Sequence, residues 1–449
     1  MRKSVAALLL LAPFVVSAET LTLDQAIERA LSADPRIEER QHLVAAARGL
    51  LQEVEGNGDW FVDANAFVGL APQASGNIFE NGACTAAQCN LRDDRYDIDG
   101  LTGWFNLQMG LIKPLYSFGK FENYLAAAKA NIEIKGGDVR LQRVATVLDV
   151  KKAYYGYLAA RDARLLLGDV DKRIQSAIEL VSGWLEDGGG DAKQSDLYAL
   201  QAGQALLGKY RAQAVALEKI ALAGLKVVTG VGLDADIEVA DQRLEPVALP
   251  ELSLAELKQQ ALSDRPEMQQ LEAGLKARRS LVEASKAGNR PNLYAGLVGM
   301  VSYAPGRDRL NNPFISDPFN DAGITPVVGV KWDWKGGVQR GKTASAQAEL
   351  DALISKSDLA RMGIPYQVAE QYYQVQGYHE SVEKLAEASR SSRRWMIASY
   401  TDFEAGLEKA DKVMTAFQAY VVASSDYIQT TFDYNMHVAQ LESATGVRQ

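Results

Sequence analysis

The sequence has little cysteine and little histidine, and this scarcity limits the chemistry it can carry. Two cysteines and three histidines occur in 449 residues, and His42, His379 and His437 lie far apart along the chain. A zinc site needs several such ligands at close spacing. No Gly-x-Ser-x-Gly nucleophile motif occurs, and the glycines at 188–190 lack the lysine and hydroxyl residue that complete a phosphate loop. We expect no catalysis, no cofactor and no bound metal.

An excess of positive charge is also missing. The chain holds 48 lysines and arginines against 57 aspartates and glutamates, a formal net charge of −9. Loss of Arg2 and Lys3 with an export signal leaves 46 basic residues against 57 acidic ones. Proteins that bind nucleic acid need a basic surface, so we expect no nucleic acid partner.

After the first eighteen residues, the sequence has no apolar run of membrane-spanning length. Arg2 and Lys3 precede an apolar stretch of about twelve residues, short of the roughly 20 that a spanning helix needs. Ser17 and Ala18 supply small residues before the expected cleavage point. We expect residues 1–18 to be a signal peptide. If the mature chain crosses a membrane, it must do so with strands.

The two cysteines, Cys84 and Cys89, lie in a loop rich in glycine, asparagine and alanine. An exported protein meets an oxidising compartment, where a close cysteine pair favours a local disulfide. A metal site is the alternative, but the sequence offers no third and fourth ligand at suitable spacing. We therefore expect Cys84 and Cys89 to form a disulfide.

The main positive feature is an internal repeat. Residues 21–35 return as residues 252–266 at a constant offset of 231. The identical positions in the first copy are Leu21, Leu23, Ala30, Leu31, Ser32 and Pro35. Tyr154 and Tyr372 lie 218 residues apart, and each half ends on Thr-Gly-Val. The sequence predicts two repeats, at 19–231 and 252–449, joined by an acidic linker at 232–251.

Each repeat contains two stretches in which apolar side chains alternate with polar ones. They lie at residues 60–70 and 101–115 in the first repeat, and at 291–303 and 324–333 in the second. Strands of about 9–11 residues with one apolar and one mixed face are typical of membrane barrels. A half-buried sheet in a soluble protein has the same alternation, so the strands alone do not decide between the two.

Very long helices follow the strand pairs. Residues 120–187 and 342–405 keep a helical apolar period. A helix of about 65 residues is about 100 Å long, against a globular average of about 11–12 residues, and such lengths are typical of coiled coils or tubes. Pro365 is expected to kink the second helix. Return helices are predicted at residues 195–228 and 410–444.

Four strands per chain cannot close a barrel, and an open sheet edge in lipid leaves backbone groups unpaired. Two copies give eight strands, whose interior is filled by side chains, whereas three copies give twelve strands with room for a lumen. We therefore predict a homotrimer with a twelve-stranded β-barrel, four strands per chain, continued by a long α-helical barrel. The predicted fold class is mainly α with membrane β and two internal structural repeats.

These motifs, in their order and their duplication, resemble the TolC-type outer-membrane efflux proteins, the outer membrane factors of tripartite efflux and type I secretion systems. The resemblance covers essentially all of the mature chain. It depends on the following motifs: Leu-x-Leu-x-x-Ala-x-x-x-Ala-Leu from Leu21 to Leu31, Pro35, the strand-to-helix passage at 114–120, residues 126–130, the tyrosine pair at Tyr154, and Gly190-x-x-x-x-Ser-Asp196-Leu with its echo Gly406-x-x-x-Ala-Asp411-Lys-Val.

The resemblance implies a trimer in the bacterial outer membrane with a helical tunnel that crosses the periplasm. The turns near Gly190 and Gly406 form the periplasmic tip, which meets a periplasmic adaptor (membrane fusion) protein coupled to an inner-membrane transporter. The channel itself supplies no energy. It opens when the adaptor engages, by a small shift between packed helices.

Residues near the two tips are the site candidates. Glu186, Asp187 and Asp191 flank Gly190, and we hypothesise that this acidic cluster docks a basic adaptor tip; Asp196 and Gly406 complete the adaptor contact candidates. TolC-type channels constrict the pore with acidic residues past the second tip. Here that region holds Asp411, Lys412 and Thr415, the gate candidates, so the paired-carboxylate ring is not reproduced. Asp196 and Asp411 could instead cap the return helices.

A periplasmic adaptor-like coiled-coil protein without a pore is the alternative function, because it too is exported and has helical hairpins. Such a protein needs neither four amphipathic strands nor doubled long helices. Aromatic residues near the strand ends could form interfacial belts against outer-membrane lipid or could pack at the base of the barrel. They are Trp60, Trp104, Tyr116, Tyr294, Trp332 and Trp334.

Overall fold

The computed structural model describes residues 19–73, 85–87, 100–188, 192–309 and 317–446. The expected signal peptide lies outside these ranges, as do Cys84, Cys89, Gly190 and Asp191. No helix in the described ranges combines the length and the apolar character needed to cross a membrane.

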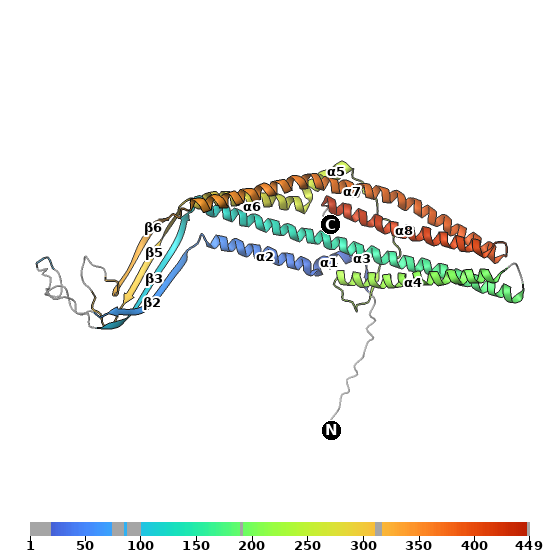
Figure 1. Ribbon diagram of the computed structural model, residues 1–449, viewed down its shortest axis with the longest axis horizontal. Helices are drawn as coiled ribbons and strands as arrows, with labels where there is room; N and C mark the ends of the chain where they lie inside the picture. Colours follow the sequence, from blue (N-terminus) through green and yellow to red (C-terminus); the bar gives the residue numbers. More distant parts are fainter. Residues whose placement is uncertain (1–18, 74–84, 88–99, 189–191, 310–316, 447–449) are drawn as a thin grey trace, which may run out of the picture. The chain divides into compact units, whose positions relative to one another are not determined.

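The chain forms two compact units, and each unit takes residues from both sequence repeats (Figure 1). The sheet unit consists of Leu43–Lys135 and Gln270–Ser357; the helical unit consists of Met1–His42, Gly136–Gln269 and Asp358–Gln449. The long helices α3 (Lys120–Asp187) and α7 (Gly336–Glu404) contribute residues to both. The repeats are therefore units of sequence, whereas each compact unit combines matching pieces of the two repeats.

The sheet unit contains one antiparallel sheet with the strand order β2-β3-β5-β6. Its strands are β2 (Phe61–Pro72), β3 (Leu101–Tyr116), β5 (Asn292–Tyr303) and β6 (Asp321–Lys331). Three lie within two residues of the predicted bounds. β6 begins at Asp321 instead of residue 324, because the residues before Ile324 continue the pairing with β5.

The strand register aligns the alternating apolar positions of the four strands, so that one face of the sheet is almost entirely apolar. Val62 lies opposite Leu111, and Leu111 lies opposite Leu297. The other face is mixed, since Asn65 lies opposite Gln108. A slip of one residue at any strand pair would send that strand's apolar side chains to the opposite face. The alternation seen in the sequence is therefore consistent across the whole sheet.

Helices connect directly to one end of this sheet, which we call its base. The turn from β3 to α3 needs a positive φ at Phe118 (54°) and at Gly119 (92°). Arg290 Nη1 donates to the Phe118 carbonyl oxygen at 2.9 Å and holds the turn. The helix α2 (Pro35–Gly56) precedes β2, and α6 (Pro266–Lys286) precedes β5. Each hairpin of the sheet is thus entered and left through a helix.

The helical unit packs α3 and α7 with the return helices α4 (Gln194–Val228) and α8 (Ala410–Thr445) (Figure 1). α7 begins at Gly336, six residues earlier than predicted, and continues through Pro365. Side chains three or four positions apart form the apolar core, and burial of each contributes roughly 1.5–3 kcal/mol. The members of this core include Val170, Ile174, Val181, Leu200, Met396, Phe403, Val413 and Phe417.

A second core lies around the first described residues, near Leu21. The strand β1 (Glu19–Leu21) pairs in parallel with β4 (Ile237–Val239), which lies within the segment predicted to be a linker. The short helices α1 (Leu23–Ala33) and α5 (Leu254–Asp264) begin with equivalent capping boxes, at Thr22 and at Ser253. Both repeats therefore open with the same local structure, as the sequence repeat predicts.

Candidate functional site

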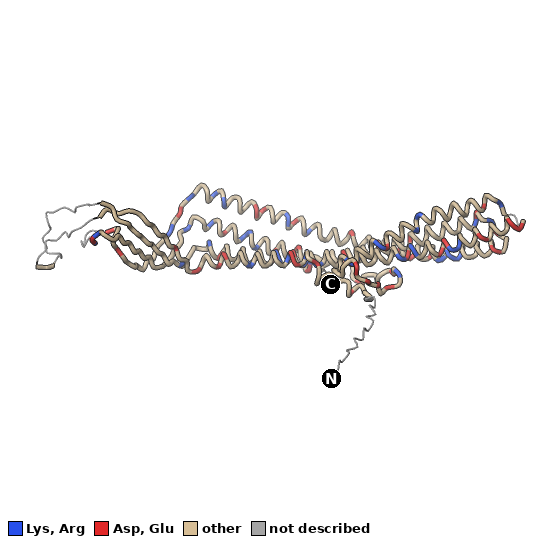
Figure 2. Tube along the Cα trace, turned by 90° about the horizontal axis from the view of Figure 1, so that it is seen from below, with Lys and Arg blue, Asp and Glu red and all other residues tan. Residues whose placement is uncertain are grey.

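The sheet carries an extensive exposed apolar face. Side chains on it include Val68, Ile324 and Val328, which are 85%, 78% and 75% exposed. Few charged residues lie along the strands, whereas acidic and basic residues alternate along the helices (Figure 2). Soluble monomers rarely expose a contiguous apolar surface of this kind. Such a face indicates contact with lipid or with another protein.

Both edges of the sheet are open within the described chain. β2 and β6 each pair on one side only, along twelve and eleven residues. Because neighbouring strands alternate in direction, β6 of one copy can pair antiparallel with β2 of another. Such pairing satisfies the free N–H and C=O groups, which is a requirement in lipid. The sheet thus has the geometry of one segment of a closed barrel.

The aromatic residues near the strand ends divide between the two faces. Trp332 is exposed at the base and donates from Nε1 to the Asn289 carbonyl oxygen at 2.8 Å. Trp60 is also exposed there, with Lys113 Nζ 5.8 Å from its ring centre. Trp104 and Tyr294 lie on the mixed face instead. Their strand positions have the opposite parity to the apolar face, so of the two roles left open, packing fits these two residues better than a belt role.

The first tip is the turn between α3 and α4. Glu186 and Asp187 are exposed at the end of α3, and Gly188 adopts a φ of 64°. Asp196 lies in the first turn of α4, and its Oδ2 accepts a hydrogen bond from the Lys193 backbone N–H at 2.9 Å. Asp196 therefore caps the helix start. Gly190 and Asp191 lie outside the described residues.

The second tip is the turn between α7 and α8, where Gly406 adopts a φ of 72°. Leu407 is 80% exposed in this turn. Asp411, Lys412 and Thr415 are all exposed on the first turns of α8, and Thr415 Oγ1 donates to the Asp411 carbonyl oxygen at 2.8 Å. Acidic residues lie at both tips, Glu186 and Asp187 at the first and Glu404 and Glu408 at the second, but only the second carries an exposed leucine among the described residues.

Aromatic contacts join the two helical hairpins just behind the tips. Trp184 of α3 stacks edge-on against Phe403 of α7, with ring centres 5.3 Å apart. Tyr400 lies 6.1 Å from the fully buried Phe417 of α8. Burial raises the pKa of the Tyr400 hydroxyl, so it stays neutral. The hairpins therefore meet near the tips through apolar and ring contacts.

The segment that follows β4 crosses the helical unit as a strap, here defined as residues 240–247. The Tyr154 hydroxyl donates to Asp241 Oδ2 at 2.8 Å. The buried side chain of Asn435 on α8 holds the strap with two bonds: its Oδ1 accepts from the Val247 N–H and its Nδ2 donates to the Glu245 carbonyl oxygen, both at 2.9 Å. The strap therefore links α3 of the first repeat to α8 of the second.

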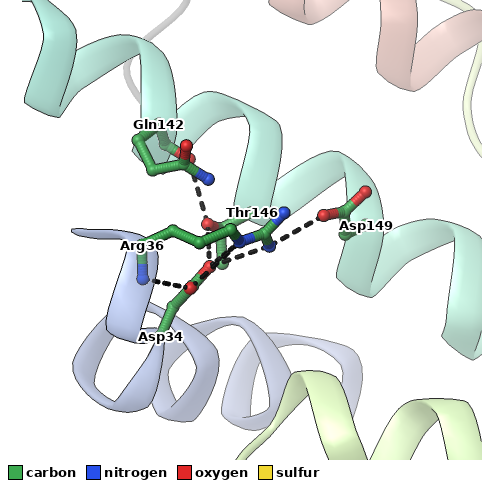
Figure 3. A network of polar contacts seen from close by, with 5 residues as sticks. All are labelled: Asp34, Arg36, Gln142, Thr146 and Asp149. Carbon is green, nitrogen blue, oxygen red and sulfur yellow. Dashed lines mark hydrogen bonds and ion pairs between the residues drawn. The ribbon is translucent and has the colours of Figure 1, made fainter. Parts of the chain in front are cut away.

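A polar network holds the junction between α1 and α2 against α3 (Figure 3). Arg36 donates from Nε and Nη2 to the Asp34 carboxylate, and its Nη2 also reaches Asp149 at 2.8 Å. Thr146 Oγ1 donates to Asp34 Oδ2 at 2.5 Å. Burial is the largest influence on the pKa of Asp34 and raises it, but the hydrogen bonds from Arg36 and Thr146 together hold that pKa below its ordinary value.

The second repeat has the same junction with the charges exchanged. Asp34-Pro-Arg36 corresponds to Arg265-Pro-Glu267 at the offset of 231. Arg265 donates from Nη2 to Glu267 and from Nη1 to Gln367, each at 2.8 Å. Gln367 occupies the position equivalent to Asp149, 218 residues later. Sequence reasoning missed this exchange, although the matching prolines marked both junctions.

Within the described ranges, no group of His, Cys, Asp and Glu side chains is arranged to hold a metal ion. The perturbed groups of the helical unit are structural. Burial raises the pKa of Tyr155 to about 12, and burial followed by the bond to Asp241 raises that of Tyr154. Both tyrosines therefore stay protonated and act as packing or hydrogen-bonding groups.

The chain was compared with known families and proteins. Residues 257–447 match the family model described as outer membrane efflux protein. A comparison with curated protein sequences gives no match. The family match covers the second repeat from α5 through α8, which is the half that contains the exposed leucine tip.

Solved structures match 94% of this chain. The CmeC outer membrane channel of Campylobacter jejuni has 12% identity and a TM-score of 0.74 over 85% of its length. The outer membrane protein VceC of Vibrio cholerae has 14% identity and a TM-score of 0.73 over 96% of its length. The open state of the Neisseria gonorrhoeae MtrE outer membrane channel has 16% identity and a TM-score of 0.72 over 88%. At these identities the likeness concerns the fold.

Proposed function

We propose that this chain belongs to the outer membrane efflux protein family and is the outer-membrane channel of a tripartite efflux or type I secretion system. It is a passive export duct that supplies no energy and catalyses no reaction. It lies in the outer membrane and extends into the periplasm. There it is coupled to a periplasmic adaptor protein and, through the adaptor, to an inner-membrane transporter.

The observation that carries this proposal is the register of the four-stranded sheet. Four strands from two distant parts of the chain together form one face that is almost entirely apolar and one mixed face that carries polar groups such as Asn65 and Gln108. One apolar face beside one mixed face is the requirement for a wall between lipid and water. An adaptor-like protein without a pore has no use for such a wall.

The open sheet edges and the surface of the helical unit support a homotrimer. Three copies of the sheet make twelve strands, enough for a lumen. In the helical unit, two stripes of exposed apolar side chains recur at helical spacing and supply surfaces for neighbouring copies. The α4 stripe consists of Tyr198, Leu206, Tyr210, Leu217, Ile220 and Val227, and the α7 stripe of Leu359, Met362, Tyr366 and Tyr373.

The two tips supply the adaptor contacts. We propose that the acidic first tip, with Glu186 and Asp187, attracts basic side chains of the adaptor, while Leu407 at the second tip buries apolar surface against it. The exposed Asp411, Lys412 and Thr415 stay the gate candidates. Because Asp196 caps α4 and Lys412 lies beside Asp411, we expect this gate to depend little on bound cations.

A matched pair of substitutions tests the wall. Leu297 and Val298 are adjacent in the middle of β5 and are 44% and 43% exposed, but they point to opposite faces. A lysine on the lipid face near the bilayer midplane costs about 2–4 kcal/mol, whereas a lysine in the lumen is tolerated. Leu297→Lys should therefore reduce the amount of assembled trimer in outer-membrane fractions.

Val298→Lys serves as the control, and should assemble normally and shift the ion selectivity of single channels in planar bilayers toward anions. Equal effects of the two lysines on assembly would contradict the proposal that the sheet is a wall between lipid and water. A wild-type protein that stays monomeric and water-soluble without detergent would do the same.

The tips are tested separately by cross-linking to the adaptor in cells. Reversal of Glu186 and Asp187 to lysine should weaken the cross-link, with a stronger effect at low ionic strength because exposed charges are screened by salt. Lysine at two exposed acidic positions remote from the tips, Glu53 and Glu55, is the control. Unchanged cross-linking in the tip variant would remove the electrostatic part of the proposal.

A further inference from the structure

The end of the sheet far from the helices, its outer end, is covered on the mixed face. Thr102 and Asn106 of β3 and Ser302 of β5 are buried there. Their neighbours on the apolar face, such as Leu101, stay exposed, and so does Gln108 two positions further toward the base. Another part of the chain therefore covers the mixed face, and it does so only at the outer end of the sheet.

The described residues that cover it are 304–309, which follow β5, and 317–320, which precede β6. We call these two short segments the mouth bend. The Phe319 ring meets Trp104 edge-on with centres 5.7 Å apart. Ser302 Oγ donates to the Pro318 carbonyl oxygen at 2.6 Å and accepts from Trp104 Nε1 at 2.8 Å. These side chains belong to the mixed face, so the mouth bend lies on that side.

A buried ion pair holds the two parts of the mouth bend together. Arg307 Nε lies 3.7 Å from Asp317 Oδ1, and the two side chains are only 10% and 2% exposed. The same guanidinium lies 4.8 Å from the centre of the Phe319 ring and donates from Nη1 to the Pro72 carbonyl oxygen at 3.0 Å. One arginine therefore connects β2, both parts of the mouth bend and its aromatic residue.

Asn320 also joins the two parts of the mouth bend. Its Oδ1 accepts from the Ala304 N–H at 2.8 Å, and its Nδ2 donates to the Arg307 carbonyl oxygen at 2.8 Å. A buried charge pair is costly to break once formed, because removal of either partner leaves the other unpaired. The bend is thus a built structure with its own directional contacts.

We propose that the mouth bend is an outer constriction of the channel, which limits the size of what crosses the extracellular mouth. The inference rests on the proposed function: in a closed barrel the mixed face lines the lumen, so the bend occupies lumen volume. Three copies of Pro318 and Phe319 then narrow the mouth together. Cargo size is limited at this end independently of the gate at the periplasmic tips.

The test measures access from outside intact cells, so the periplasmic gate does not influence it. In a background with Cys84 and Cys89 replaced by serine, a single cysteine is placed at Gln108→Cys, on the mixed face below the bend. Cells are treated with hydrophilic maleimides carried on polyethylene glycols of increasing size. The bend is opened by Arg307→Ala or, more mildly, by Phe319→Ala, which keeps the ion pair.

The inference predicts that the largest reagent able to label Gln108→Cys becomes larger in both bend variants, with a several-fold gain in labelling by the bulky reagents and little change with the smallest. An unchanged size limit in both variants overturns it. A cysteine at Met109→Cys, on the lipid face, tests the premise. If the smallest reagent labels both cysteines equally, or neither, the proposed channel fails, whatever the bend variants show.

Discussion

Replacement of Arg36 by alanine should destabilise the helical unit by about 2 kcal/mol, although the Arg36 side chain is half exposed. The reason lies in its partner, because the Asp34 side chain is only 6% exposed and receives two bonds from the Arg36 guanidinium. Loss of one partner of a fully buried ion pair costs about 3–5 kcal/mol. Asp34 keeps the Thr146 hydroxyl and the backbone N–H of residue 36, which reduces the loss.

The loss should also depend on pH with a definite sign. The folded-state pKa of Asp34 is held below its ordinary value, so this carboxylate stabilises the fold above the unfolded pKa of about 4, and the contribution disappears as the pH falls through the folded pKa. In Arg36→Ala, burial is left as the largest influence and raises that pKa. The difference in the free energy of unfolding between wild type and variant should therefore be largest at pH 7 and should shrink toward pH 4 and below.

Urea unfolding of the detergent-solubilised protein, followed by far-ultraviolet circular dichroism, measures both effects. Arg48→Ala on the same helix is the control, since Arg48 is exposed and surface substitutions usually change stability by no more than about 0.5 kcal/mol. The reasoning is refuted if the two variants unfold alike at pH 7, or if the deficit of Arg36→Ala is as large at pH 4 as at pH 7.

Three further outcomes follow from the helical unit. At the second junction the arginine, Arg265, is the buried partner. Glu267→Ala should therefore lower the free energy of unfolding by about 1–3 kcal/mol in the same assay, because it leaves a hydrogen-bond donor of Arg265 without its partner. Asn435→Ala leaves two strap groups, including the Val247 N–H, unpaired, and should speed amide exchange in the strap. Leu217→Glu on the α4 stripe should shift the trimer toward monomers in light scattering, while Glu218→Gln, whose partner is within the chain, should not.

The strands and long helices could be predicted because their signals are periodic and local. The alternation in residues 101–115 assigns its apolar side chains to the same face of the sheet as the strand register does. This agreement arises because successive side chains of a strand point to opposite faces. The helix predicted at 120–187 has those bounds in the structure. Prediction was poorer where pairing with another strand decides the bounds of an element. The start of β6 depends on the pairing of Asp321 with Ser302, which is a contact between strands.

The mouth bend and the strap could not be predicted because their partners lie far apart in sequence. Arg307 and Pro72 are 235 residues apart, and Asn435 and Val247 are 188 apart. No periodicity marks such pairs. Strand parity also distinguishes between the two roles that the sequence left open for the aromatic residues: Trp104 follows Leu101 by three positions, so it belongs with Thr102 on the mixed face.

The distribution of contacts in the helical unit gives a physical basis for movement at the tips. Away from the tips, directional polar bonds join the two repeats, such as Lys151 Nζ to Glu442 at 2.6 Å and the strap on Asn435. Near the tips, the hairpins meet through Trp184, Phe403 and the Phe417 cluster. Apolar contacts are not directional and keep most of their energy when surfaces slide, whereas a hydrogen bond weakens steeply when its angle changes. If the proposed function holds, an adaptor that pulls on the tips meets the least resistance where the gate candidates lie, and we expect the strap to confine the shift to that end.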